Sequence, residues 1–362
     1  MTVWTDALAE LIAIPSTADR PDQLGRALDF VIDAAGPGWT IRRFASRGKP
    51  SALLHPPGRT GTYRIVLNAH LDVVPAEPDQ FVPRLDENRL YGRGAHDMKA
   101  AALVLTSVFR ELAADLPYPL ALQLVTDEEV GGADGTGHQI EQGVRAGFVV
   151  IGEQSGLRVV TESKGLAQVR LVAGGEAAHA AYPWLGDNAV LTLLAGVGGI
   201  LRRYPVPAAE QWTTTVNVAR IETGNQAVNQ VPADATAWLD IRYPPEDTDF
   251  AGRSGAEIAA HLREVGGGVL DVHVDSLGPP HHANPAGAEV ALLRAAAAGV
   301  GYPGDLLRKH GAADGRFYSA RGIDAVIFGP GGGGQHGPDE YVDITTLLPY
   351  HDALIAFLRQ LS

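Results

Sequence analysis

Residues that suit metal binding or acid–base chemistry stand where several apolar runs of the sequence end. RIVLNAH ends at His70, LALQLVTDEE at Glu128 and Glu129, and GFVVIGE at Glu153. A fourth run, DAVIFGPGGGGQH, passes through four glycines to His336. Each has an ordinary explanation by itself: a solvated turn, a loop carboxylate, an exposed loop histidine. Their recurrence at the ends of four similar runs indicates a shared site.

Two further acidic residues belong to the same pattern. Asp72 follows His70 in H-L-D, a pairing that is weak by itself because surface histidines often stand near carboxylates. Asp97 stands in YGRGAHDMKA, where Gly92 and Gly94 permit a tight turn before a helix. By itself, Asp97 is better explained as the N-cap of that helix than as a ligand.

Taken together, these residues suit zinc or a similar divalent ion. The chain contains no cysteine, so a metal must be held by His, Asp and Glu. Five such ligands can hold two ions that share one bridging carboxylate, as in hydrolases whose metal ions lie roughly 3.5–4 Å apart. One member of the Glu128–Glu129 pair can then face the metal while its neighbour acts as a general base.

The elements that carry these residues alternate between strand and helix. Continuous apolar runs are typical of strands buried on both faces of a sheet. Helical spacing of apolar residues predicts helices over 98–116 and 287–301, and an amphipathic helix near the N-terminus with Thr5 as its cap. Alternation of this kind predicts an α/β domain whose ligand sites lie at the carboxyl ends of its strands.

The middle of the chain has a different pattern. Strands over 166–175, 213–224, 236–244 and 268–278 combine with helices over 188–204 and 255–265. This βαββαβ order is typical of a ferredoxin-like fold. We therefore expect residues 1–165 and 277–362 to form the α/β domain, interrupted by a compact lid of residues 166–276.

Composition excludes several classes of function. The net charge of −13 over 362 residues disfavours a nucleic-acid partner, whose phosphates would be repelled. No apolar run approaches the roughly 20 residues that a membrane-spanning helix needs. The first residues lack the basic start of a secretory signal, so we expect a cytoplasmic enzyme.

Five ordered motifs resemble those of one enzyme family. NAHLDVVP, LYGRGAHDMKAA, VTDEEVGG, IGEQSG and FGPGGGGQHGPDEYV are similar to motifs of the metallopeptidases and deacylases that include acetylornithine deacetylase, succinyl-diaminopimelate desuccinylase, aminoacylase and carboxypeptidase G. The resemblance extends over nearly the whole chain. It implies a zinc-peptidase-like catalytic domain, with a mostly parallel sheet covered by helices, and an inserted ferredoxin-like lid that also forms dimers. One departure is Gln154, where many relatives have proline.

The resemblance also implies a metal-ligand set. One ion would be held by His70, Asp97 and Glu153, and the other by Asp97, Glu129 and His336, so that Asp97 is the bridge. The ions are expected to be zinc, although the same ligands accept cobalt or manganese.

Further roles follow from the same resemblance. Asp72 would orient the His70 ring. Glu128 would take a proton from the attacking water and deliver it to the leaving amine. His179, in GGEAAHAAYPWLGDNAV, would polarise the scissile carbonyl, commonly across a dimer interface, although a structural histidine is the alternative.

The substrate contacts implied by the resemblance lie in the inserted region. Asn229 and Arg242 would bind substrate, and an Arg could grip a substrate carboxylate with both nitrogens. An ion pair with Asp240 or Glu246 is the structural alternative for that arginine. GAADGRF resembles a loop beside the substrate pocket, but neither Asp314 nor Arg316 receives a role.

The expected activity is therefore hydrolysis of the amide bond of N-acyl amino acids by a two-metal enzyme. A dipeptidase or carboxypeptidase with the same site is the alternative, and an inactive binding or scaffold protein of the same fold is another. GPGGGG at 329–334 matches a dinucleotide-binding pattern, but no helix start and no βαβ unit follow it. We expect a small-molecule or short-peptide substrate and a homodimer formed through the lid.

Overall fold

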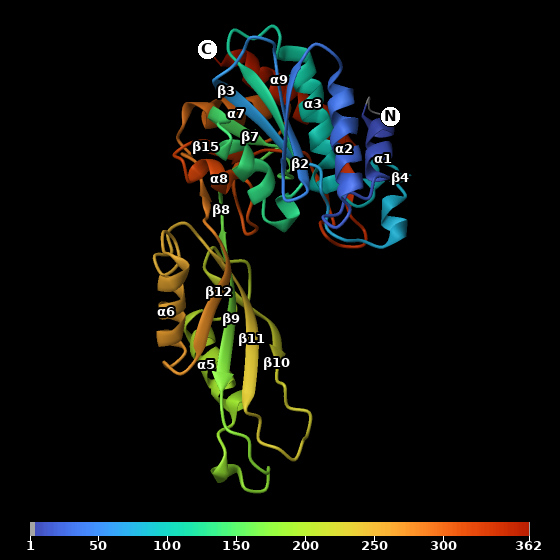
Figure 1. Ribbon diagram of the computed structural model, residues 1–362. Helices are drawn as coiled ribbons and strands as arrows, with labels where there is room; N and C mark the ends of the chain where they lie inside the picture. The colour runs from blue at the N-terminus through green and yellow to red at the C-terminus, as the bar shows by residue number, and fades with distance from the viewer. Residues whose placement is uncertain (1–3, 362) are drawn as a thin grey trace. The chain divides into compact units, whose positions relative to one another are not determined.

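The four apolar runs are neighbouring strands in a computed structural model of the chain, which describes residues 4–361. They lie in the order β6 (Leu120–Val125), β3 (Thr62–His70), β7 (Arg145–Ile151) and β15 (Asp324–Ile327). All three pairings between them are parallel. Their carboxyl ends therefore meet at one edge of the sheet, as predicted (Figure 1).

Antiparallel strands extend this parallel centre on both sides. β2 (Lys49–His55) pairs antiparallel with both β6 and β1 (Thr40–Ser46), and β8 (Val159–Ser163) pairs antiparallel with β15. Within residues 4–361 the sheet has nine strands, the others being β1, β2, β8, β13 (His281–His282) and β14 (Leu306–Lys309). A separate small sheet consists of β4 (Arg84–Asp86), β5 (Arg89–Tyr91), β16 (Gly332–Gly333) and β17 (Tyr341–Asp343).

Helices cover both faces of the large sheet, because alternate strand residues point to opposite sides. Leu67 and Leu122 belong to the larger core, and Val66 and Ala121 to the smaller one. The larger core lies under α1 (Thr5–Ile12), α2 (Pro21–Ala35), α3 (Ala100–Leu112), α7 (Ala288–Gly299) and α9 (Leu347–Gln360). The smaller core lies under α4 (His138–Glu141) and α8 (Gly315–Ser319). The predicted α/β class is confirmed.

The predicted cap of the first helix was wrong, and the N-cap role considered for Asp97 alone is excluded. Thr5 is the first residue of α1 and not its cap, because the carbonyl of Trp4 already accepts the first helical hydrogen bond, from Leu8. Asp97 is not the N-cap of α3, because that helix is capped at Lys99 and Asp97 lies in the irregular turn before it. The backbone of Asp97 has φ −119° and ψ 93°, which is outside the helical region.

The inserted region forms a four-stranded antiparallel sheet in the order β10-β11-β9-β12, which is ferredoxin-like. Its strands are β9 (Gly165–Gly174), β10 (Thr215–Glu222), β11 (Asp234–Tyr243) and β12 (Asp271–Gly278). Two helices, α5 (Ala189–Arg203) and α6 (Gly255–Val265), share a core with alternate residues of β9 and β11. The opposite face of the sheet carries polar and aromatic residues, including Trp238.

The chain thus folds into two compact units with separate cores. The first unit comprises the residues up to Glu162, His282–Arg308 and the residues from Ala313 onward. The second comprises Ser163–His281 and Lys309–Ala312.

No helix among residues 4–361 is long and apolar enough to span a bilayer.

Candidate metal centre

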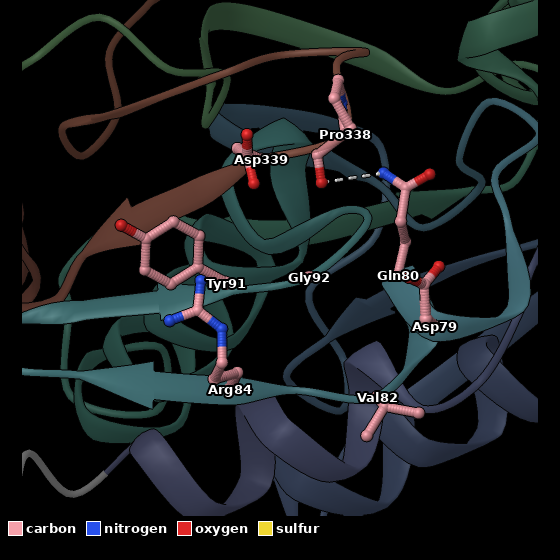
Figure 2. Close-up of a pocket in the computed structure, with 8 residues that line it drawn as sticks. All are labelled: Asp79, Gln80, Val82, Arg84, Tyr91, Gly92, Pro338 and Asp339. Carbon is pink, nitrogen blue, oxygen red and sulfur yellow. Dashed lines mark hydrogen bonds between the residues drawn. The ribbon is translucent and has the colours of Figure 1, made fainter.

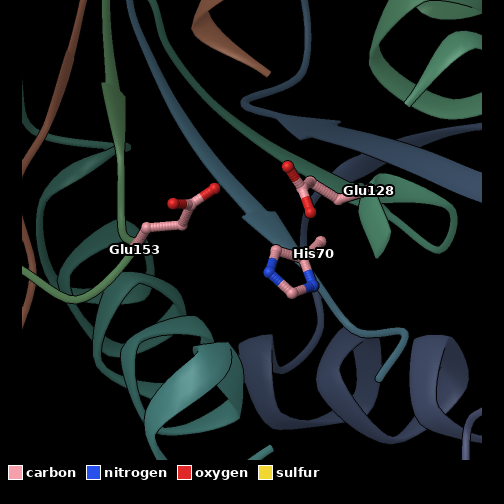
Figure 3. Close-up of side chains that lie close together, drawn as sticks. All are labelled: His70, Glu128 and Glu153. Carbon is pink, nitrogen blue, oxygen red and sulfur yellow. The ribbon is translucent and has the colours of Figure 1, made fainter. Parts of the chain in front are cut away.

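The edge of the first unit's sheet brings the predicted metal-binding side chains together. His70 is the last residue of β3, Glu153 follows β7, and the 3-10 turn Glu128–Val130 follows β6. Figure 3 shows the side chains of His70, Glu128 and Glu153 pointing toward one another from these three strand ends. His336 approaches from the loop between β16 and β17.

Asp97 lies between the two imidazoles of the cluster. Its Oδ1 lies 3.0 Å from Nε2 of His70, and its Oδ2 lies 3.3 Å from Nε2 of His336. Nε2 of His336 also lies 3.2 Å from Oε1 of Glu129. One oxygen of Asp97 therefore faces each histidine, which is the arrangement expected of a bridging carboxylate.

These separations fit ligands that share an ion. Zinc–nitrogen and zinc–oxygen bonds of about 2.1 Å place neighbouring ligand atoms roughly 3.0–3.4 Å apart. Among the described residues, two groups present ligand atoms that all lie within 4.8 Å of one another: His70, Asp97 and Glu129 in one, and His70, Glu128 and Glu153 in the other. His70 belongs to both groups, and His336 contacts Asp97 and Glu129, so the five predicted ligands and Glu128 form a single cluster.

The histidines of this cluster are strongly basic because carboxylates surround them. Hydrogen bonds to Asp97 and Glu129 raise the pKa of His336 to about 10. Burial opposes a charge on His70, but the carboxylates of Asp72 and Asp97 outweigh burial and raise its pKa well above the usual range. Both imidazoles therefore bind protons tightly in the metal-free protein, and a cation must displace those protons.

The glutamates show the complementary effect. Burial, followed by the negative charge of Glu153, raises the pKa of Glu128 well above its usual range. Burial also raises the pKa of Glu129, although its hydrogen bond with His336 opposes the rise. Carboxylates this close to one another favour a bound cation, and the imidazole–carboxylate donor set suits a pair of divalent ions. The residues present therefore fit two such ions.

Asp72 makes more contacts in the site than the predicted one with His70. Nδ1 of His70 donates a hydrogen bond to the main-chain oxygen of Asp72 at 3.0 Å, while the Asp72 carboxylate is 3.6 Å away. That carboxylate instead accepts hydrogen bonds from the backbone N–H groups of Glu128, at 3.2 Å, and Glu129, at 2.9 Å. Asp72 is fully buried and joins the His70 strand to the glutamate turn.

Asp314 and Arg316, which received no role from the sequence, support the same glutamate turn. Nη2 of Arg316 donates to the carbonyl of Gly131, the residue after the turn, at 2.7 Å. Asp314 accepts a hydrogen bond from Thr136 and lies so close to Gly132 that a Cβ there would be 2.1 Å from its Oδ1. Their position in the GAADGRF motif was the signal that singled them out.

One contact of the cluster was missed by sequence reasoning. Nε2 of Gln335 donates to Oδ2 of Asp97 at 2.5 Å, the oxygen that also faces His336. Its only signal in the sequence is its position directly before that histidine.

The remaining predicted site residues lie in the second unit. His179 and Asn229 are on adjacent loops, because Ala180 N–H donates to the carbonyl of Asn229 at 2.9 Å. Nδ1 of His179 accepts from the backbone N–H of Ala181, so a neutral His179 carries its proton on Nε2 and can donate it. Arg242 instead forms a two-pronged ion pair with Asp240, at 2.6 and 3.1 Å, which is the structural alternative stated above.

Comparison with known sequences gives the same family as the motifs. The profile of Peptidase family M20/M25/M40 matches residues 66–360. A succinyl-diaminopimelate desuccinylase of Verminephrobacter eiseniae is 28% identical, over 96% of this chain and 94% of its own length. A probable carboxypeptidase of Aspergillus terreus is 35% identical over 61% of this chain, and the match spans 53% of that protein.

Solved structures share the fold over nearly the whole chain. An M20 family metallo-carboxypeptidase of Sulfolobus solfataricus superposes with a TM-score of 0.78 at 18% identity, covering 99% of both chains. A dinuclear metal-binding M20 peptidase of Bacillus subtilis superposes with a TM-score of 0.67 at 14% identity, covering 98% of this chain and 96% of the other.

Proposed function

Because the chain belongs to Peptidase family M20/M25/M40 and is a metal-dependent hydrolase, we propose that it cleaves the amide bond of N-acyl amino acids. The observation that carries this proposal is Asp97, which presents one oxygen to each of two imidazoles beside the Glu128–Glu129 pair. A deacylase is favoured over a peptidase because the desuccinylase relative matches over nearly its whole length, whereas the carboxypeptidase relative matches over about half.

The proposed ligands are those of the sequence analysis. His70, Asp97 and Glu153 would hold one divalent ion, and Asp97, Glu129 and His336 the other, with zinc as the expected metal. When bound, such ions lower the pKa of a coordinated water and polarise a carbonyl oxygen.

Glu128 is the proposed general base. Its carboxylate lies within 4.8 Å of ligand atoms of both His70 and Glu153. A carboxylate oxygen of Glu128 would accept the proton of the attacking water and then deliver it to the leaving nitrogen. Asp72 keeps this side chain in place through the backbone of the turn.

His179 is proposed to act on the substrate carbonyl. A neutral imidazole with its proton on Nε2 donates a hydrogen bond to an oxygen that becomes more negative as the reaction proceeds. Asn229, on the adjacent loop, is proposed to bind substrate beside it. The role of Arg242 as a carboxylate-binding residue also remains a proposal, and it requires the ion pair with Asp240 to open or to accommodate the substrate.

A panel of substrates tests the proposed reaction. The metal-reconstituted protein would be assayed with N-acetyl and N-succinyl amino acids and with dipeptides, with and without a chelator. We expect kcat/KM to be highest for an N-acyl amino acid and hydrolysis to stop on chelation. Faster cleavage of dipeptides would favour the peptidase alternative, and no cleavage of any amide would favour a scaffold.

We also propose that the active species is a cytoplasmic homodimer formed through the second unit. Large apolar side chains are exposed on that unit, among them Leu191 and Leu194 on α5 and Trp184 on the loop that contains His179. Exposed apolar surface of this kind is typical of protein interfaces. A sedimentation experiment that found only an active monomer would contradict this proposal.

A further inference from the structure

A buried ion pair links two loops of the proposed metal centre. Arg93 and Glu340 are 3% and 1% exposed, and Nη1 of Arg93 lies 2.5 Å from Oε2 of Glu340. Removing two charges from water carries a large desolvation cost, which is offset only where both groups also find good hydrogen-bond partners. The hydrogen-bond partners of Arg93 and Glu340 show which backbone segments the pair positions.

Glu340 holds the backbone from which Asp97 projects. Its second oxygen, Oε1, accepts hydrogen bonds from the backbone N–H of His96 at 3.0 Å and of Asp97 at 3.1 Å. Backbone N–H groups bound to a carboxylate form short and directional contacts. The position of the Asp97 side chain therefore depends on where Glu340 lies.

Arg93 holds the loop that carries the second histidine. Its Nη2 donates to the carbonyls of His336 and Gly337, both at 3.1 Å. His336 has a left-handed backbone with φ 59°, a conformation that a residue other than glycine keeps only where its surroundings fix it. The hydrogen bond from Arg93 to the carbonyl of His336 is one such restraint.

The loop that carries His336 is also held by the side chain of Gln80. The amide of Gln80 donates to the carbonyls of Gly337 at 2.9 Å and Pro338 at 3.3 Å. Figure 2 shows the amide of Gln80 directed at the carbonyl of Pro338. Restraints on both sides leave the His336 loop little freedom to move away from Asp97.

We propose that Arg93 and Glu340 are positioning residues that fix the distance between Asp97 and His336, and thereby the affinity for the ion bound by Asp97, Glu129 and His336. This inference rests on the proposed function, which assigns those ligands. His70 is positioned by other groups, the main-chain oxygen of Asp72 and the sulfur of Met98. The first ion shares only Asp97 with this ligand set, whereas the second depends on the placement of both Asp97 and His336. Loss of the Arg93–Glu340 pair should therefore weaken the second ion more than the first.

Two conservative variants test the proposal. Glu340→Gln keeps an oxygen for the N–H groups of His96 and Asp97 but loses the charge that holds Arg93. Arg93→Lys keeps the charge but loses the fork that reaches both loop carbonyls. Calorimetric titration of the metal-free proteins with Co²⁺ should show two ions bound by the wild type. In both variants the second ion should bind about 10–100-fold more weakly, and the first ion, which shares Asp97, should be weakened by a smaller factor.

A matched control separates positioning from general stability. Glu289→Gln removes a 2.8 Å ion pair with Arg64 elsewhere in the first unit and should leave both Co²⁺ affinities unchanged. Visible absorption of bound Co²⁺ provides a second readout, since displaced ligands alter its spectrum. Thermal unfolding of the metal-free variants shows whether they fold.

The outcomes are distinguishable. If the wild type binds two ions and both variants bind two with wild-type affinity, the positioning role is wrong and the proposed function stands. Equal weakening of both ions together with a lower unfolding temperature would also overturn it, in favour of a purely structural pair. A wild type that binds fewer than two ions would contradict the proposed function itself.

Discussion

Glu128 is the residue whose replacement best separates chemistry from metal binding. In the proposed reaction Glu128 moves a proton, while the ligands are other side chains, so Glu128→Gln should retain both metal ions. Because a general base typically contributes a factor of 10² to 10⁴, we expect kcat to fall by about that factor. Metal content by elemental analysis and kcat on the best N-acyl amino acid would be measured on the same sample.

The Glu128 prediction has two contrary outcomes. Turnover at the wild-type rate would show that Glu128 is not the base. Loss of one metal ion along with activity would instead show that Glu128 is a ligand, as its closeness to His70 and Glu153 also allows.

Asp314 should make the stability of the metal-free protein depend on pH. Burial, followed by the negative charge of Asp127, raises the pKa of Asp314 to about 7. In the unfolded chain an aspartate titrates near 3.9, so the folded state binds this proton more tightly. The resulting stabilisation is complete below about pH 4 and is lost as the pH rises through about 7.

The variant Asp314→Asn tests this dependence. Relative to the variant, the free energy of unfolding of the wild type should fall by up to about 1.4 kcal/mol per pH unit between pH 4 and 7. Urea unfolding in the presence of a chelator would give both curves. If the two curves were parallel across this range, the pKa of Asp314 would be the same in the folded and unfolded states.

The residues of the centre could be predicted from the sequence only where their position repeated a pattern. His70, Glu129, Glu153 and His336 each follow an apolar run, and parallel strands bring such positions to one edge. Arg93 and Glu340 lie within two of the quoted motifs, but nothing in either motif shows that these two residues pair, because their contact joins segments far apart in the chain.

At the scale of the elements, the periodicity of apolar residues predicted the four central strands and the βαββαβ order of the second unit. Gly92 and Gly94 indicated a turn before α3, but its backbone conformation could not be predicted, because the N–H groups of His96 and Asp97 are bound by Glu340, a residue far along the chain. Local sequence made Asp97 resemble a helix cap, and the long-range contact decided otherwise.

Gly329 sets how closely β15 can approach the end of β7. A Cβ at this position would lie 2.4 Å from the carbonyl oxygens of both Gly152 and Glu153, and neither backbone group can rotate away. Gly329→Ala should therefore displace the backbone of Glu153, whose side chain is a proposed metal ligand. We expect a loss of about 3 kcal/mol in the free energy of unfolding, with a reduced metal content.

Gly25 is the matched control for this substitution. It lies inside α2, where an added Cβ meets nothing within 4 Å. Gly25→Ala should increase the free energy of unfolding by about 0.5–1 kcal/mol, because alanine favours the helix. If both variants changed stability by the same amount, the close approach at Gly329 would have no energetic importance.

At the scale of the whole molecule, the two units have separate hydrophobic cores. The core of the second unit comprises residues of β9–β12, α5 and α6, and the large sheet of the first unit has two cores of its own. Among the described residues, both groups able to hold a metal lie in the first unit. Metal binding should therefore stabilise one unit and leave the other unaffected.

Calorimetry with and without metal tests this independence. Zn²⁺ at about 100 times its Kd stabilises the state that binds it by about 2.7 kcal/mol, which raises the unfolding temperature of a unit this size by roughly 5–10 °C. We expect two unfolding transitions. When a chelator is added, the unfolding temperature of the first unit should fall and that of the second should stay the same. Tryptophan fluorescence assigns them, because Trp4 and Trp39 lie in the first unit and Trp184, Trp212 and Trp238 in the second.

The doubly substituted variant Trp4→Phe, Trp39→Phe reports on the second unit alone. Its fluorescence transition should stay at one temperature whether or not Zn²⁺ is present, while the calorimetric transition of the first unit moves. A single transition that shifts as a whole with Zn²⁺ would mean that the second unit unfolds only together with the first. In that case the proposed metal centre would determine the stability of the entire chain.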